Sequence, residues 1–245
     1  MTPFRSTKPI PPRERLIMAL DVPSIGDAEA LVTELDDSII FYKVGLELFM
    51  CGDYFGFIEW LKGRGKKVFV DLKFFDVPET VGRAVRALSR TGVDFATVHG
   101  NDAIMQAAAR EKGALKVLAV TVLTSLDRGD LNDLGFTCDV RELVLSRARR
   151  ALALGCDGVI SSGLEVPFLR EEVDHKLLVI SPGIRPLENR PDDDQKRVVT
   201  VEQAFRNGAD YIVVGRPIRD AANRREAAEA AQSQILSVFE GSDSP

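Results

Sequence analysis

The chain has 245 residues, of which 45% are hydrophobic and 28% are charged, and its mean hydropathy is -0.03. This is a globular composition, and the length fits either one α/β barrel of roughly 250 residues or two smaller domains. A formal net charge of -5 and an isoelectric point near 5.3 argue against a general nucleic-acid-binding protein, which would carry a basic surface, but leave room for a local cationic pocket.

Short apolar runs alternate with longer amphipathic segments after a polar, proline-rich lead-in at residues 1–15. The runs are rich in Val, Ile or Leu and are apolar at nearly every position, which is typical of parallel strands buried on both faces. The predicted strands span residues 16–20, 39–44, 67–72, 95–98, 116–122, 158–161, 177–180 and 211–214.

Helix signals fill the segments between these strands. Ser24 and Asp139 are placed to cap helix N-termini, Pro78 suits a first helical turn, and Gly155 suits a helix end. The predicted helices include residues 25–35, 80–88, 140–154 and 223–239. Eight strands with helical crossovers predict a single-domain (β/α)8 barrel, or TIM barrel, over residues 16–240.

The three cysteines, Cys51, Cys138 and Cys156, are widely spaced and form no CxxC pair, so neither a zinc site nor a disulfide framework is expected. Residues 1–12 contain four prolines and no apolar core, unlike a signal peptide. No apolar run approaches the ~18 residues of a membrane span. We therefore expect a cytoplasmic protein that binds neither membrane nor nucleic acid.

Polar residues follow the predicted strands at their carboxyl ends, where α/β barrels carry their chemistry. They are Asp21, Lys43, Asp71, Lys73, His99, Thr124, Ser125, Ser161, Arg185, Gly215 and Arg216. Strand ends commonly carry polar turn or capping residues, and this alternative is as strong as a functional role for Ser161. It is weaker for paired lysines and aspartates, because turns seldom need a buried lysine.

The segment from Asp71 to Thr80 carries the strongest signal. On a regular strand the side chains of Asp71 and Lys73 share one face, about 6.6 Å apart. Asp76 falls beyond the strand end, and Lys43 can reach Asp71 from the preceding strand. Alternating cations and anions stabilise one another when they leave water. The alternative is an ion-pair network without a chemical role.

Lys43 together with Asp71-x-Lys73-x-x-Asp76 resembles the charge array of the orotidine 5'-phosphate decarboxylase family. The likeness extends from residues 16–21 through 182–185 to 214–218. It implies conversion of orotidine monophosphate to uridine monophosphate, the last step of de novo pyrimidine nucleotide synthesis, with no cofactor and no metal. It further implies that Lys73 protonates C6 of the pyrimidine, that Asp71 lies beside the substrate carboxylate, and that Lys43 holds Asp71 and contacts the ribose.

The same resemblance implies a homodimer in which Asp76 and Thr80 reach into the partner's site. Asp21 matches a ribose-binding aspartate of the family, and Thr124 with Ser125 matches a pair that reads the pyrimidine edge. Without the resemblance, each of these three would serve equally well as a turn residue.

A phosphate site is expected after the last two strands. Gly215 and Arg216 follow the eighth strand, where barrels bind phosphate through backbone N–H groups, and Arg185 after the seventh strand is a second candidate cation. The long polar stretch at residues 186–198 is a solvated loop by composition. The resemblance implies that it closes over the phosphate with Gln195.

Three positions depart from the family pattern. Phe75 replaces a histidine common in bacterial members, Glu79 stands where asparagine is frequent, and residues 100–102 replace a small glycine-rich turn. None of these changes removes a charge of the array. We expect His99 to be a packed residue of the rim rather than a catalyst.

Two alternatives remain open at this point. A magnesium-dependent sugar-phosphate decarboxylase or aldolase of the same suprafamily shares the Asp-x-Lys-x-x-Asp motif, but carries a glutamate metal ligand where this chain has Lys43. A cation at that position would repel magnesium. The second alternative, a non-catalytic nucleotide-binding barrel, would bind nucleotides without turnover.

Overall fold

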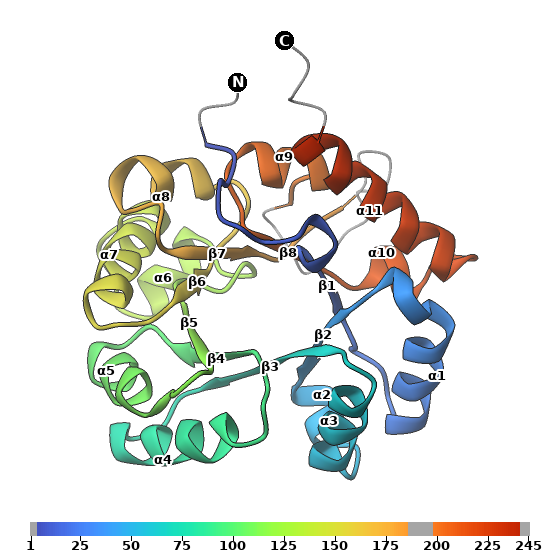
Figure 1. The fold of residues 1–245 in the computed structure, drawn as a ribbon. Coiled ribbons are helices and arrows are strands. Elements are labelled where there is room, and N and C mark those ends of the chain that lie inside the picture. The colour runs from blue at the N-terminus through green and yellow to red at the C-terminus, as the bar shows by residue number, and fades with distance from the viewer. Residues whose placement is uncertain (1–3, 186–197, 241–245) are drawn as a thin grey trace.

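The protein is described by a computed structural model, which covers residues 4–185 and 198–240. Eight parallel strands pair in chain order, and the first pairs with the last, so the sheet closes (Figure 1). The strands are β1 (Leu16–Ala19), β2 (Phe41–Gly45), β3 (Lys67–Phe74), β4 (Phe95–His99), β5 (Lys116–Val120), β6 (Gly158–Ile160), β7 (Leu178–Ser181) and β8 (Tyr211–Val214). The predicted TIM barrel is therefore confirmed.

Helices surround the barrel on its outside (Figure 1). They are α1 (Ile25–Leu35), α2 (Leu46–Phe49), α3 (Tyr54–Gly63), α4 (Pro78–Ser89), α5 (Asp102–Glu111), α6 (Arg128–Asp133), α7 (Val140–Ala153), α8 (Val166–Glu172), α9 (Val201–Arg206), α10 (Arg216–Arg219) and α11 (Arg224–Glu240), with 3-10 turns at Pro12–Glu14 and Asp36–Ser38. The predicted caps are confirmed, since Ser24 accepts from Asp27 N at the start of α1 and Asp139 accepts from Glu142 N at the start of α7.

Alternation along the strands divides the core into two layers. One layer lies between the strands and the helices, and a smaller one fills the barrel interior. Phe41, Phe95 and Tyr211 each open their strands, and their rings meet edge to face with centroids 5.0 to 5.9 Å apart. This aromatic cluster closes the amino-terminal end of the barrel and leaves the polar side chains at the opposite end.

The described part of the lead-in, residues 4–15, packs against the barrel instead of standing apart from it. Asp210 is fully buried, and its carboxylate accepts from Arg170 at 2.8 Å, from Lys8 at 2.9 Å and from Ser6 at 2.5 Å. The buried Arg15 donates to the carbonyl oxygen of Asp210 at 3.1 Å. This charged cluster ties the lead-in to the start of β8.

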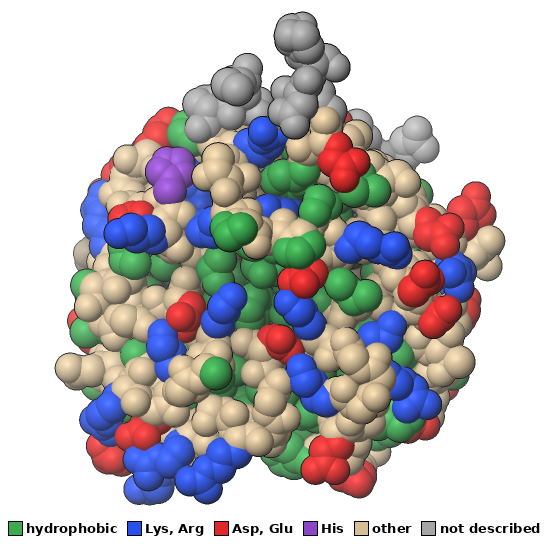
Figure 2. Space-filling model, in the orientation of Figure 1, with side chains coloured by type: hydrophobic (Ala, Val, Ile, Leu, Met, Phe, Trp, Pro, Cys, Tyr) green, Lys and Arg blue, Asp and Glu red, His purple; other side chains and the backbone are tan. Residues whose placement is uncertain are grey.

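The surface carries charges of both signs. Figure 2 shows one face, on which basic and acidic side chains are interspersed. Within the described ranges, no helix combines the length and apolarity needed to cross a bilayer.

Candidate active site

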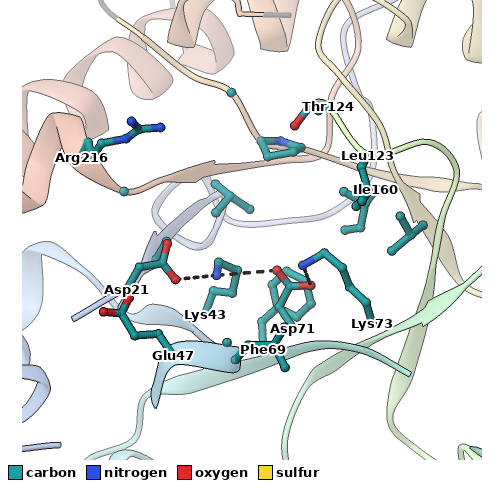
Figure 3. Close-up of a pocket in the computed structure, with 18 of the residues that line it drawn as sticks. Asp21, Lys43, Glu47, Phe69, Asp71, Lys73, Leu123, Thr124, Ile160 and Arg216 are labelled. Atoms are coloured by element: carbon teal, nitrogen blue, oxygen red, sulfur yellow. Dashed lines mark hydrogen bonds and ion pairs between the residues drawn. The ribbon is translucent and has the colours of Figure 1, made fainter. Parts of the chain in front are cut away.

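A cavity of about 370 Å³ opens at the carboxyl end of the barrel. Residues in or just after seven strands, β1 to β3 and β5 to β8, line it. Its position is the one where α/β barrels carry their chemistry. Figure 3 shows its two sides, with a row of charged residues on one and Arg216 and Thr124 on the other.

Four of the predicted residues form a continuous row of alternating charges (Figure 3). Lys43 Nζ lies 3.0 Å from Asp21 Oδ1 and 3.6 Å from Asp71 Oδ2. Lys73 Nζ lies 3.0 Å from Asp71 Oδ1. The side chains of Lys43 and Asp71 are 11% and 13% exposed, whereas that of Lys73 is 35% exposed. Of the two lysines, Lys73 is thus the more open to the cavity and to solvent.

Gly45 leaves room for this arrangement. A Cβ atom added at Gly45 would lie 3.2 Å from Lys43 Nζ and 3.7 Å from Asp21 Oδ1. A side chain at this position would therefore press on the ammonium that joins the two carboxylates.

The protonation states of the row follow from its contacts. Burial opposes the charge on Lys43, but the carboxylates of Asp71 and Asp21 outweigh it and hold the pKa of Lys43 above its ordinary value. Burial likewise opposes the charge on Asp71, yet the ammonium groups of Lys43 and Lys73 hold the pKa of Asp71 below its ordinary value. At neutral pH both groups are charged.

Asp71 and Lys73 face the same cavity, as expected, but the expectation of a regular strand was wrong. β3 pairs with β4 at Val70 and again at Phe74, with a register shift between them. Lys73 has φ 47°, in the left-handed region that a non-glycine residue seldom adopts. The lysine and the aspartate therefore meet across an irregular stretch of the strand.

Three arginines also line the cavity. Arg185 follows β7, and Gly215 with Arg216 follows β8, as expected for a phosphate site. Arg219, which sequence reasoning missed, also lines the cavity, and its Nη1 donates to the carbonyl oxygen of Asp21 at 2.7 Å. Its position one helical turn after Arg216 was the available signal.

The remaining predicted residues divide into three groups. Thr124 lines the cavity, while Ser125, in the same turn, is exposed outside the lining. Asp76 is exposed, with its carboxylate accepting from Val77 N at 2.6 Å, and Thr80 also lies outside the lining. Gln195 falls outside the described residues. A single chain therefore brings together three charges of the predicted Lys43, Asp71, Lys73 and Asp76 set, with Asp21 as the fourth member of the row.

Two rim residues make packing contacts. His99 stacks on Phe75 with ring centroids 4.2 Å apart, and its Nδ1 lies 2.8 Å from Asn101 Oδ1. Ser161 is fully buried and donates to Glu165 at 2.6 Å. Neither residue lines the cavity. Glu47, which does, was missed because it stands on α2, beyond the strand end.

A closed (β/α)8 barrel with an ion-paired pocket at the carboxyl ends of its strands places the protein among α/β barrels with the usual location of an active site. Residues 14–231 match the model of the "Orotidine 5'-phosphate decarboxylase / HUMPS family". The chain belongs to this family, as the sequence resemblance predicted.

Individual relatives agree with the family match. The chain is 76% identical over 239 residues to an orotidine 5'-phosphate decarboxylase of Methylococcus capsulatus, which covers 98% of this chain and 99% of the relative. The crystal structure of an orotidine 5'-phosphate decarboxylase from Lactobacillus acidophilus superimposes with a TM-score of 0.80 at 35% identity, over 91% of this chain and 99% of that one. The crystal structure of an orotidine 5'-phosphate decarboxylase from Pyrococcus horikoshii superimposes with a TM-score of 0.71 at 26% identity, over 90% of this chain and 98% of that one.

Proposed function

We propose that this protein decarboxylates orotidine 5'-monophosphate to uridine 5'-monophosphate without metal or cofactor. The observation that carries the proposal is the row Asp21–Lys43–Asp71–Lys73, with its two buried members fixed and the Lys73 amine facing the cavity. The 76% identity to the orotidine 5'-phosphate decarboxylase of Methylococcus capsulatus supports the same reaction here.

Lys73 stabilises the charge that the reaction creates. When the bond between C6 and the carboxyl carbon breaks, its electron pair stays on C6 as carbon dioxide leaves. An ammonium already held by Asp71 at 3.0 Å can meet that charge without reorganising. Lys73 then transfers a proton from Nζ to C6, and the resulting amine takes a proton from water.

Asp71 opposes the substrate carboxylate. Two unit charges about 4 Å apart repel by roughly 4 kcal/mol at an effective dielectric constant of 20, and the repulsion disappears as carbon dioxide forms. The contacts that lower the pKa of Asp71 keep this carboxylate ionised. We assign the larger share of the effect to Lys73, whose charge complements the transition state directly.

The rest of the nucleotide extends across the cavity. Asp21 and Lys43 bind the ribose, and Gly215 with Arg216 binds the phosphate. Thr124 reads the pyrimidine edge from the lining, and Ser125 joins it from its exposed position in the same turn. Gly215 immediately precedes the N-terminus of α10, so backbone N–H groups and a guanidinium converge there. Arg185 adds a further cation, and Gln195 completes the phosphate site from the segment outside the described residues.

A homodimer completes the site with Asp76 and Thr80 from the partner. Asp76 stands between two apolar residues that are largely exposed, Phe75 at 65% and Val77 at 63%, and Met50 beyond the neighbouring strand is 79% exposed. Exposed apolar side chains near a site favour a protein–protein contact. Such a contact would remove these side chains from water and carry Asp76 with them.

Magnesium dependence separates this reaction from the sugar-phosphate chemistry of related enzymes. Lys43 places an ammonium between the carboxylates of Asp21 and Asp71, where a divalent cation would otherwise be attracted. We expect the purified protein to convert orotidine monophosphate at its full rate in excess EDTA, followed by ultraviolet absorbance. Activity restored by magnesium alone would instead favour the sugar-phosphate reaction.

The role of Lys73 is tested by replacement. Lys73→Ala should abolish turnover while uridine monophosphate still binds, because the phosphate and ribose contacts are intact. Isothermal titration with uridine monophosphate measures the retained binding. Near-normal turnover in this variant would remove Lys73 from the mechanism, and nucleotide binding without turnover in the native protein would favour a non-catalytic barrel.

The shared site is tested by mixing inactive variants. A heterodimer of Asp76→Asn and Lys73→Ala subunits has one site with both changes and one site with neither, so activity should return after subunit exchange. Asp71→Asn mixed with Lys73→Ala is the matched control, because both residues act within one chain and each site keeps one change. Equal recovery in the two mixtures, or none in the first, would contradict the assignment of Asp76.

A further inference from the structure

The charge row depends on an irregular stretch of β3. Val70 pairs with Ala96 and Phe74 pairs with Val98, so three residues of β3, at positions 71–73, face a single residue of β4, Thr97. A bulge of this kind leaves backbone groups without their ladder partners. Lys73 also has φ 47°, a conformation that persists in a non-glycine residue where its surroundings fix it.

The Thr97 hydroxyl contacts both catalytic residues across this stretch. Its Oγ1 accepts from the Lys73 backbone N–H at 2.9 Å and donates to Asp71 Oδ1 at 2.9 Å. Lys73 Nζ lies 3.0 Å from the same oxygen of Asp71. Backbone, hydroxyl, carboxylate and ammonium are therefore linked in a ring of contacts that includes the proposed proton donor.

A hydroxyl has the chemistry that this position needs. It carries one hydrogen to donate and lone pairs to accept, so one atom can serve the amide and the carboxylate together. Thr97 is fully buried, and β4 contributes no side chain to the described cavity lining. Water is therefore poorly placed to replace it, and without the hydroxyl the Lys73 amide would lose this acceptor at a free-energy cost.

We propose that Thr97 is a positioning residue, which holds Lys73 in its left-handed conformation and orients the Asp71 carboxylate through one hydroxyl. This inference rests on the proposed decarboxylase function. Thr97 lies outside the described lining of the cavity, so its loss should act through the geometry of Lys73 and Asp71. The alignment of reacting groups suffers, while binding through the ribose and phosphate contacts persists.

Valine and serine variants separate the hydroxyl from the rest of the side chain. Thr97→Val keeps the shape and loses both hydrogen bonds, whereas Thr97→Ser keeps the hydroxyl. The control is Thr91→Val, in the turn between α4 and β4, where the hydroxyl donates to Leu88 O at 2.8 Å. It makes the same substitution away from the cavity.

We expect Thr97→Val to lower kcat on the order of 10²-fold, the cost of misplacing a reacting group by about 1 Å. The KM and the affinity for uridine monophosphate should change little, and Thr97→Ser should recover most of the lost kcat. Hydrogen exchange at the Lys73 amide should accelerate in the valine variant and stay slow in the serine and Thr91→Val variants.

The outcomes distinguish the two proposals. If the native protein does not decarboxylate orotidine monophosphate, the proposed function fails. If it does, and Thr97→Val matches the Thr91→Val control or Thr97→Ser is as impaired as Thr97→Val, the role of Thr97 alone is overturned. Should the valine variant fail to fold, exchange of the native Lys73 amide as fast as that of the exposed Phe75 would overturn it as well.

Discussion

Replacing Lys43 by methionine should destabilise the fold much more than the same replacement of Lys73. Lys43 Nζ is held by two carboxylates, Asp21 at 3.0 Å and Asp71 at 3.6 Å, and its side chain is 11% exposed. Lys73 contacts one carboxylate at 3.0 Å and is 35% exposed. The two lysines share Asp71, so burial and the number of partners are what differ.

The magnitudes follow from those contacts. Removing one partner of a buried ion pair costs about 3–5 kcal/mol, since the other charge stays behind. Asp71 keeps Lys73 and the Thr97 hydroxyl after Lys43→Met, so the lower figure of about 3 kcal/mol applies. Solvent screens the Lys73 pair, and exposed pairs contribute about 0–1 kcal/mol. Lys73→Met should therefore cost about 1 kcal/mol or less.

Thermal unfolding at matched protein concentrations measures the difference, because association makes Tm depend on concentration. For a chain of this size 1 kcal/mol corresponds to about 2–4 °C, so Lys43→Met should lower Tm by about 6–12 °C and Lys73→Met by at most about 4 °C. Both variants should lose turnover. Equal losses of Tm, or a larger loss for Lys73→Met, would refute the idea that Lys43 is the structural member of the pair.

Three further results are expected. The folded pKa of Asp71 lies below its ordinary value of 3.8, so the stability that its charge contributes is complete above that pH and is lost as pH falls through the folded pKa. The free energies of unfolding of the native and Asp71→Asn proteins, measured in urea, should therefore differ by a constant amount from about pH 5 to about pH 8 and converge in acid. Asp210→Asn should lower the free energy of unfolding in urea by about 3–5 kcal/mol, because it leaves the buried cations without their carboxylate, and should not change kcat of the folded protein. An unchanged stability would contradict the role of the charged cluster around Asp210 in tying the lead-in to the barrel. Arg216→Leu should raise KM more than Arg219→Leu does, because Arg216 begins α10 directly after Gly215 at the proposed phosphate site, whereas Arg219 lies at the end of that helix. The reverse order in steady-state kinetics would assign the phosphate to Arg219.

The order of strands and the location of the site could be predicted from local patterns. Apolar runs marked all eight strands, and polar residues at their ends marked the rim where Lys43 and Asp71 meet. The third strand was predicted to end at residue 72, but β3 continues to Phe74. A strand interrupted by a bulge does not show the regular pattern on which the prediction depended.

The contacts that join distant parts of the chain could not be predicted. In the sequence Thr97 has no feature that distinguishes it from other strand residues, because its proposed role depends on the register of β4 against β3. The lead-in likewise reads as a polar tail, yet Lys8 meets Asp210 some two hundred positions later. Neither pair has a local signal, since each is set by how the barrel closes.

The structure also accounts for which lysine gives up a proton in the proposed reaction. Lys43 is enclosed by two carboxylates that favour its charged form, so loss of its proton would leave Asp21 and Asp71 facing each other without a cation between them. Lys73 has one carboxylate partner and a side chain open to the cavity, and after it loses a proton Lys43 still compensates Asp71. Two lysines in one row thus take different tasks. The buried Lys43 holds the carboxylates in place, and this leaves Lys73 free to act as the acid.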